Sequence, residues 1–361
     1  MKASISLLQT ALIIILSTGL SNDVIIIPIL LDAAKQDAWI SVLLACACSF
    51  AWIALLYTGI IKIRNQHLFE WLKQAYPPIV GHFLTIIASA YLFVLCVVTV
   101  KDTVHWIQTT FSTNTPIFML TFVLVLICTI NAFLGIHSLA NTAGVLFPFV
   151  ILLSFFVMVA NIPHKDYSYL EPSLFHGIQP VWNGTLYVAA GFIEVILILF
   201  LQHHIRSSIS YRSLGFIVLV LMGLTIGSLI DAIVEFGPDE AAKLRFPVYE
   251  EWRLVTIGRY IEHIDFLSIY QWFCGAFLRI SLMMYLLIDI FNIQKKRKRV
   301  MALGFIFLLI VGICIIPFED QSYLNLLSTY LLPLSVWGMF IFSLIVVILI
   351  NLAYRRGKLI S

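Results

Sequence analysis

Several polar side chains in this sequence stand inside long apolar runs, where their chemistry would be most useful and most costly. Glu194 and Arg279 lie well inside such runs, and Asp23 lies nearer the end of the first one. An ionisable group at membrane depth is expensive, so each of these residues is a candidate for a functional site. Each acid also has a structural reading: Glu194 as a buried, protonated carboxylic acid, and Asp23 as a helix N-cap.

Arg279 needs a carboxylate or backbone carbonyls as partners at this depth. An ion pair with Glu194 or with Asp289 is the favoured interpretation. Asp289 itself lies close to the end of its apolar run, where we expect water to reach it. Tyr91 and Gln271 are candidates to line a cavity, with ordinary packing as the alternative for both.

The composition identifies the solvent of this chain as lipid. Of its 361 residues, 61% are hydrophobic and only 11% are charged, with a mean hydropathy of +1.00. A soluble domain has about a quarter charged residues and roughly half apolar ones. No soluble fold of this length keeps so much apolar surface from water, so we expect an integral membrane protein.

The apolar runs have the length of membrane-spanning helices. A helix needs about 20 mostly apolar residues to cross the hydrocarbon core. The chain shows no alternation of the kind that marks a transmembrane β-barrel, so the predicted fold class is an all-α polytopic membrane protein with about ten transmembrane helices. The predicted spans are 5–31, 39–61, 82–106, 116–134, 142–162, 180–203, 213–236, 266–291, 300–318 and 326–353.

The distribution of Lys and Arg predicts the orientation. If the N-terminus is cytoplasmic, most of the 22 basic residues fall in cytoplasmic segments, with Glu70 as the acid among them. The outer loops then collect the other extramembrane acids. Basic residues favour the cytoplasmic side, so both termini are predicted to be cytoplasmic. The basic run 295–299 is interpreted as a topology anchor at anionic lipid rather than as a nucleic-acid site.

Ten spans allow a division into two halves of opposite topology. Repeat one covers about 5–162 and repeat two about 180–353, within a single membrane domain 1–361. The outer segment 237–265 is predicted to be amphipathic, with a surface helix in its second half. A five-plus-five inverted repeat is typical of secondary transporters, whose substrate site lies where the first helix of each repeat is broken.

Both predicted repeat-starting helices contain such an interruption. Five of the seven residues 17–23 are Ser, Thr, Asn or Asp, in the middle of an apolar helix. Ser, Asn and Asp cap helix starts, so a second half-helix is predicted to begin there, with free backbone N–H groups that would hold a carboxylate. The segment 189–194 carries Gly191, which loosens the helix, followed by Glu194. The pattern suits a zwitterionic ligand.

The sequence contains no motif typical of an enzyme or of a metal site. It has no H-E-x-x-H, no G-x-S-x-G, no P-loop and no dinucleotide fingerprint, so neither catalysis nor a cofactor is expected. Its six cysteines lie inside apolar runs. Cys46 and Cys48 face different sides of a helix, which fits core packing rather than a metal site or a disulfide.

Several of these segments together carry a resemblance to a known family. They are 246–253 (FPVYEEWR), 258–266 (GRYIEHIDF) and 279–285 (RISLMMY), with Pro28 and the segment 191–194 in the two interrupted spans. On these residues the whole chain resembles the B subunit of spore germinant receptors. That subunit is a branch of the amino acid–polyamine–organocation transporter superfamily.

The resemblance implies a LeuT-like transporter fold and a small germinant as ligand, most often an amino acid such as L-alanine. It implies sensing at the inner membrane of a dormant spore. The implied partners are an A-type subunit with its own membrane domain and a lipid-anchored C-type subunit, with no role for nucleic acid. By the same resemblance, Thr18, Gly19, Ser21, Gly191 and Glu194 would lie near the ligand.

The leading hypothesis is therefore a ligand-sensing receptor subunit, and the alternative is an active amino acid or amine permease. Both functions use the same cavity, so the sequence does not separate them. A purely structural scaffold would need no polar pocket, and the paired interruptions argue against it. The candidate ligand-binding residues are Thr18, Gly19, Ser21, Asp23, Tyr91, Gly191, Phe192, Glu194 and Gln271, with Arg279 in a structural ion pair.

Overall fold

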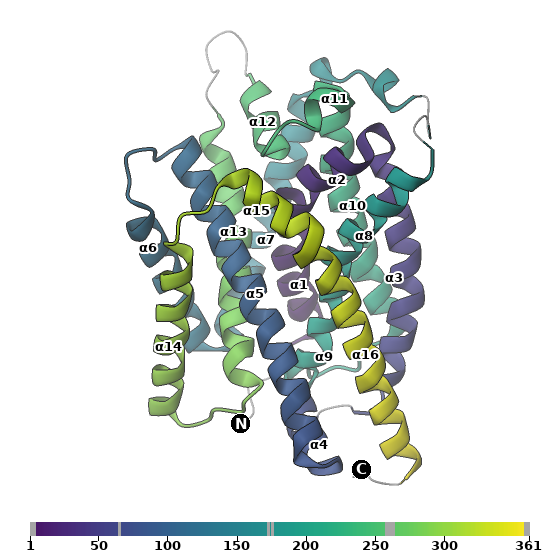
Figure 1. Ribbon diagram of the computed structural model, residues 1–361, viewed down its shortest axis with the longest axis vertical. Helices are drawn as coiled ribbons and strands as arrows, with labels where there is room; N and C mark the ends of the chain where they lie inside the picture. Colours follow the sequence, from purple (N-terminus) through teal and green to yellow (C-terminus); the bar gives the residue numbers. More distant parts are fainter. Residues whose placement is uncertain (1–4, 64–65, 172–173, 175–176, 257–263, 357–361) are drawn as a thin grey trace.

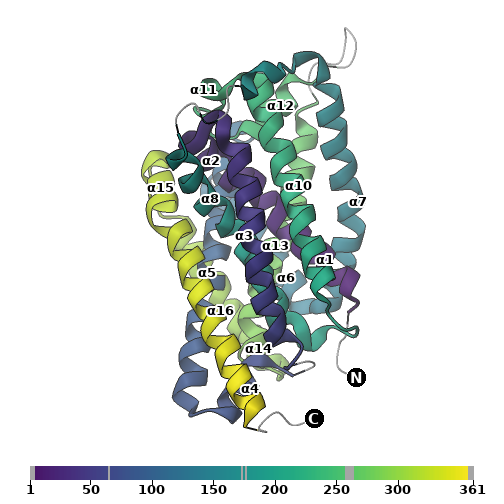
Figure 2. The same ribbon diagram turned by 90° about the vertical axis from the view of Figure 1, so that its right-hand side faces the viewer.

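The computed structural model describes residues 5–63, 66–171, 174, 177–256 and 264–356. This part of the chain forms one bundle of long helices that run roughly along a common axis (Figures 1 and 2). The predicted surface helix in 253–265 falls mostly on residues 257–263, outside the described residues.

The helices follow one another in an order that matches the predicted spans. The first crossing is α1 (Leu7–Ser21), η1 (Asn22–Ile26) and α2 (Ile27–Ala34), and after η2 (Lys35–Asp37) come α3 (Ala38–Ile60), α4 (Leu68–Ala75), α5 (Pro78–Thr110), α6 (Ile117–Leu134) and α7 (Ile136–Ala160). The short η3 (Ile162–His164) and η4 (Tyr167–Leu170) lead to the sixth crossing, which is α8 (Gln179–Phe192), η5 (Ile193–Ile196), α9 (Leu197–Leu201) and η6 (Gln202–His204). The rest are α10 (Tyr211–Phe236), α11 (Pro238–Ala241), α12 (Pro247–Leu254), α13 (Phe266–Asp289), α14 (Lys296–Cys314), α15 (Asp320–Leu326), η7 (Leu327–Leu331) and α16 (Leu332–Arg355).

By length and composition, eight stretches of the described chain could span a membrane. One of them, Leu7–Ile60, has 54 residues, far more than one crossing needs. It reverses at Lys35, whose φ is 47°, and so supplies two crossings. The eight stretches therefore supply nine crossings. The helix α14 begins with four basic residues and is apolar after them, and it is the tenth crossing. The described chain thus contains the ten predicted helices.

The central helices are those that carry the intramembrane charges. Of the 18 most apolar consecutive residues in each helix, 89% are buried inside the protein in α13 and 83% in Gln179–His204, whereas only 17% are buried in α7. The helices α6, α7 and α14 lie at the periphery and expose apolar side chains, as a lipid-facing surface requires. Glu194 and Arg279 therefore lie in the core of the bundle.

The first and sixth crossings are interrupted, as predicted, but neither is unwound. The interruption in the first is a π-helix over Asn22–Ile26, and the one in the sixth is a 3₁₀ turn over Ile193–Ile196. The Asn22 N–H donates to the carbonyls of Gly19 and Thr18, and the Ile27 N–H donates to Asn22. The predicted free backbone N–H groups and the predicted cap are therefore wrong. A π-helix widens the helix while keeping its backbone paired.

The two interruptions pack directly against each other. The Asn22 side chain lies against Gly191, and a Cβ at position 191 would collide with that amide. Asn22 Nδ2 in turn donates to Thr225 Oγ1 on α10, at 3.2 Å. Gly191 thus permits close approach of two helices, rather than loosening its own helix as the sequence suggested.

We expect Gly191→Ala to destabilise the protein by about 1–3 kcal/mol, because the added methyl group forces the interruptions apart. The measurement is thermal unfolding of the detergent-solubilised full chain. Gly338→Ala in α16 is the matched control, since no atom lies within 4 Å of its added Cβ. That change should be neutral or mildly stabilising. Equal melting temperatures for the two variants would contradict the close packing.

Candidate functional site

A buried ion pair between α13 and the 3₁₀ turn η5 forms the centre of the site. The Arg279 guanidinium donates to both carboxylate oxygens of Glu194, with Nη2 to Oε1 at 2.6 Å and Nη1 to Oε2. The two residues are 2% and 3% exposed. Bidentate pairing of this kind is the strong form of an ion pair and satisfies both charges inside the bundle.

Three further contacts tie the pair to neighbouring helices. Arg279 Nε donates to Thr99 Oγ1 on α5 at 2.9 Å, and Nη1 also donates to the Ser17 carbonyl on α1 at 3.2 Å. Thr18 Oγ1 donates to Glu194 Oε2 at 3.2 Å. A guanidinium has five N–H donors, and these bonds use four of them. One N–H on Nη2 is left over.

A small cavity of about 20 Å³ lies beside this pair, with room for about one water molecule. Arg279 and Asp102 both line it, together with hydroxyl groups and Trp272. Asp102 Oδ2 is buried and has no hydrogen-bond partner among the described residues. Arg279, which keeps one unused N–H on Nη2, and Asp102, whose Oδ2 has no partner among the described residues, therefore both belong to the wall of the cavity.

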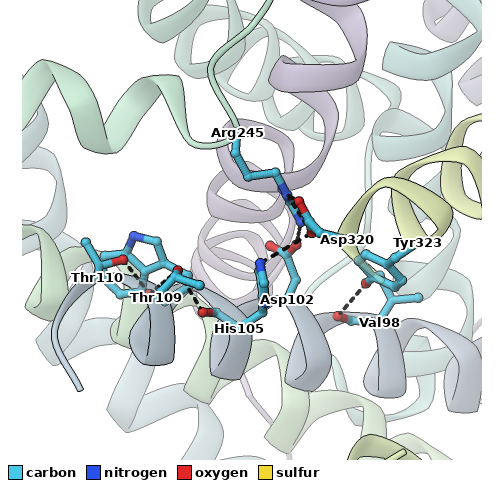
Figure 3. Close-up of polar contacts among 9 residues, drawn as sticks. Val98, Asp102, His105, Thr109, Thr110, Arg245, Asp320 and Tyr323 are labelled. Carbon is cyan, nitrogen blue, oxygen red and sulfur yellow. Dashed lines mark hydrogen bonds and ion pairs between the residues drawn. The ribbon is translucent and has the colours of Figure 1, made fainter. Parts of the chain in front are cut away.

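A second charge cluster forms around Asp102, one of the residues that line the cavity (Figure 3). Arg245, in the loop between α11 and α12, donates to Asp102 Oδ1 at 2.6 Å and to Asp320 of α15 at 3.1 Å. His105 Nε2 lies 3.3 Å from Asp320 Oδ1. Burial lowers the pKa of Arg245, but the two carboxylates outweigh it and hold that pKa above its usual value. Arg245 thus clamps three elements together over the cavity.

Aromatic packing reinforces this cover. Trp106 stacks on Trp272 with ring centroids 4.0 Å apart, and Phe246 meets Trp272 edge-on. Tyr249 packs edge-on against Trp106. The Arg245 guanidinium lies over the Phe246 ring at 4.4 Å. The loop before α12 therefore contributes one cation, Arg245, and one ring, Phe246, which packs on Trp272 in the wall of the cavity.

The opposite end of the bundle is closed by a cluster around Asp289. Its carboxylate lies 3.1 Å from the Nε2 atoms of both His203 and His204, and Tyr285 Oη lies 2.9 Å from His204 Nε2. The side chain is 15% exposed. The expectation that Asp289 is a solvated residue is wrong, because two histidines at the end of the sixth crossing fold over it.

His67 also reaches this cluster, through Nε2 and the Asp289 carbonyl at 2.8 Å. In the described chain, His67, His203 and Asp289 each place one ligand atom within 4.8 Å of the others. The ligands of a bound zinc ion lie closer, about 3.4 Å apart. The ring nitrogens here already bind the Asp289 oxygens, so we assign no metal to them.

The structure separates the predicted site residues into groups. Thr18 and Glu194 join the ion pair, and Ser21 lines the small cavity. The Tyr91 hydroxyl on α5 is buried with no partner among the described residues. Asp23 and Gln271 line a different cavity. Three residues have packing positions: Gly19 faces Leu224, Gly191 faces Asn22, and Phe192 is fully buried.

The residues that complete the site are not among the predicted site residues. Asp102, Thr99 and Trp272 line the small cavity, and Arg245 covers it. Asp102 carried a usable signal, since it is an acid within the predicted span 82–106. Arg245 carried none, because a loop arginine before α12 shows no pattern that aims it at the cavity.

Comparison with known proteins places the chain in a family. Residues 4–323 match the family model described as spore germination protein. The chain belongs to the spore germination protein family. It is 44% identical to spore germination protein XB of Bacillus anthracis over 354 residues, 98% of this chain and 99% of that protein. It is 25% identical to spore germination protein KB of Bacillus subtilis (strain 168), over 79% of this chain and 77% of that protein.

The fold of this spore germination protein is that of a LeuT-like transporter, as predicted. A solved structure of Mhp1, a nucleobase-cation-symport-1 family transporter, matches 100% of this chain and 95% of its own, with a TM-score of 0.64. That structure is a closed conformation with bromovinylhydantoin bound, and its sequence identity to this chain is 12%. The family and the long apolar helices together make the chain an integral membrane protein, and its fold is transporter-like.

We expect Arg279→Gln to cost about 3–5 kcal/mol of stability, because it leaves the Glu194 charge buried and unpaired. Adding Glu194→Gln should recover much of this loss. Thermal unfolding of the purified chain measures both. Arg253→Gln is the control, since Arg253 is 58% exposed in its pair with Glu250 and should matter by less than about 1 kcal/mol. A double variant as unstable as Arg279→Gln would contradict the coupling.

Proposed function

We propose that this protein is the ligand-sensing membrane subunit of a spore germinant receptor. In this proposal it lies in the spore inner membrane with both termini cytoplasmic. It binds a small amino acid in the cavity between Arg279 and Asp102 and acts with A-type and C-type receptor subunits. The observation that carries the proposal is the cavity itself, whose wall includes both Arg279 and an Asp102 carboxylate with one unpartnered oxygen.

A zwitterion complements this pair of groups. Its carboxylate would take the remaining N–H of Arg279, and its ammonium group would take Asp102 Oδ2. Unpaired polar atoms at this depth cost free energy, so a ligand that pairs both gains more than one that pairs either alone. The hydroxyls of Ser21 and Thr99 line the same cavity. Its small volume means that an amino acid enters only when the cover moves.

The same geometry supplies a signal. The Asp102 carboxylate is shared between the cavity and Arg245, which also holds Asp320. A ligand ammonium on Asp102 competes with Arg245 for the same charge. Binding would therefore weaken the clamp between α5, the loop before α12 and α15. A ligand can shift such an equilibrium only through this difference in contacts between the two states.

An active amino acid or amine permease is the second candidate, favoured by the likeness to a transporter fold. Reconstitution of the full chain in liposomes with radiolabelled amino acids separates the two. Binding without uptake under a proton or sodium gradient is the expected result. Sustained uptake driven by either gradient would replace the receptor with the permease.

Germination of spores that carry single substitutions tests the binding site. Asp102→Asn and Glu194→Gln should each raise the amino acid concentration needed for half-maximal germination, by about tenfold or more, because each removes a charge that holds the ligand or its arginine partner. Immunoblots of the membrane fraction give the protein level for each variant, so that the response is compared per amount of protein, because Glu194→Gln leaves the Arg279 charge without its carboxylate. Glu240→Gln, at an exposed pair with Lys243, is the control. An unchanged response in both variants would remove the ligand from this cavity.

A further inference from the structure

A second, larger cavity lies on the other side of the first crossing. Its volume is about 120 Å³, and it lies between η1, α7, α10, α12 and α13. None of its lining residues also lines the cavity next to Arg279. Its polar lining consists of Asp23, Asp231, Glu251 and Gln271 with the two serines Ser154 and Ser228. It is a separate site, formed by different side chains.

Three of these side chains present unpaired acceptor atoms. Asp23 Oδ1, Glu251 Oε1 and Gln271 Oε1 have no hydrogen-bond partner among the described residues. Their residues are 7%, 3% and 7% exposed, so bulk water does not satisfy them. Buried acceptors without donors cost free energy. A ligand that brings donors into this cavity removes that cost.

The surrounding protein supplies too little positive charge for these acids. Lys165 Nζ lies 2.6 Å from Asp231 Oδ1 and 3.7 Å from Glu235 Oε1, and it also donates to the Met158 carbonyl at 3.0 Å. Its side chain is 2% exposed, so it is fixed in these contacts. One ammonium group therefore serves the side of the cluster formed by α10. Asp23 and Glu251 gain no hydrogen bond from it among the described contacts.

We propose that this cavity binds the ammonium group of a small organic cation, held by Asp23 and Glu251 with Gln271 as a further acceptor. Apart from Ser154 and Ser228, the rest of the wall is mainly apolar and includes Phe155, Val248 and Trp252. Such walls fit an alkyl chain, whereas a bare metal ion needs oxygen ligands on most sides. Lys165 is already engaged, so the cavity offers no cation to the carboxylate of a zwitterion.

The volume restricts the ligand to a few heavy atoms. The cavity next to Arg279, at about 20 Å³, has room for about one water molecule, so on the same measure this cavity has room for several. Propylammonium, which has about four heavy atoms' worth of volume in its three carbon atoms and one nitrogen atom, is a ligand of this kind. The site goes beyond the proposed amino acid site and does not depend on it.

Glu251 couples this site to pH. Burial, and then the charges of Glu235, Asp231 and Asp23, raise the pKa of Glu251 well above its usual value, and Lys165 offsets this only in part. The empty site therefore holds a proton on Glu251 at pH values where an exposed glutamate is ionised. A cation favours the ionised form, so its binding releases a proton. Affinity should consequently rise with pH through the raised pKa.

The test is isothermal titration calorimetry of the full chain in lipid nanodiscs, with propylammonium chloride as the probe. We expect saturable binding of propylammonium, and none of propan-1-ol, propionate, sodium chloride or calcium chloride at matched concentrations. Tighter binding on going from about pH 6 to about pH 8, with proton release seen by comparing two buffers, should accompany it. Binding of the neutral or anionic analogue, or of the metal ions in place of propylammonium, would overturn the proposal, as would no binding at all.

Substitutions locate the probe. Glu251→Gln and Asp23→Asn should each weaken propylammonium binding by about ten- to hundredfold, since each removes a charged partner. Glu250→Gln is the matched control, because Glu250 is the adjacent residue on α12 but does not line this cavity. Equal affinity in all three variants would overturn the assignment. The comparison of propylammonium with propan-1-ol on the unaltered chain stands even where a variant fails to fold.

Discussion

The ion pair between Arg279 and Glu194 is the constraint around which this bundle is organised. Neither charge survives at the centre of a membrane protein without a partner, and each supplies the other's. The pair also takes Thr18 and Ser17 of the first crossing and Thr99 of α5 as hydrogen-bond partners. One interaction thereby fixes the relative positions of both interrupted crossings, α5 and α13.

The cover and the inner cluster follow the same electrostatic logic at the two ends. Arg245 holds Asp102 and Asp320 on one side (Figure 3). Two histidines hold Asp289 on the other. Between them lies the cavity beside Arg279, which has room for about one water molecule. The arrangement is a closed state in which every strong charge but one oxygen of Asp102 has a described partner near the cavity. That oxygen is where a change of state would begin.

The helix count and the places of the interruptions could be predicted from the sequence, because they depend on long apolar runs broken by Ser, Asn and Gly. The LeuT-like fold was expected from the resemblance to a known family. The form of the interruptions could not. Asn22 and Asp23 looked like a cap, yet the backbone stays paired in a π-helix and Asn22 packs on Gly191 instead. Whether a polar run caps a half-helix or lines a contact depends on its neighbour, which local sequence does not contain.

The functional residues show the same division. Glu194 and Arg279 stood out because they are isolated charges in apolar helices. Asp102 and Arg245 are 143 residues apart in the sequence, and their ion pair forms only because the loop before α12 folds against α5. Asp289 looked accessible to water from its position near a helix end, and only the return of His203 and His204 encloses it. Long-range contacts of this kind leave no periodic signal in a single sequence.

The central claim is that an amino acid spans the cavity between Arg279 and Asp102, and solid-state NMR of the full chain in lipid tests it most directly. Alanine labelled with ¹³C at its carboxylate is added to protein labelled with ¹⁵N on arginine side chains. The account predicts dipolar dephasing that places the carboxylate within about 4 Å of a guanidinium nitrogen, and its loss in the Asp102→Asn variant. A bound alanine whose carboxylate shows no coupling to any arginine would contradict it.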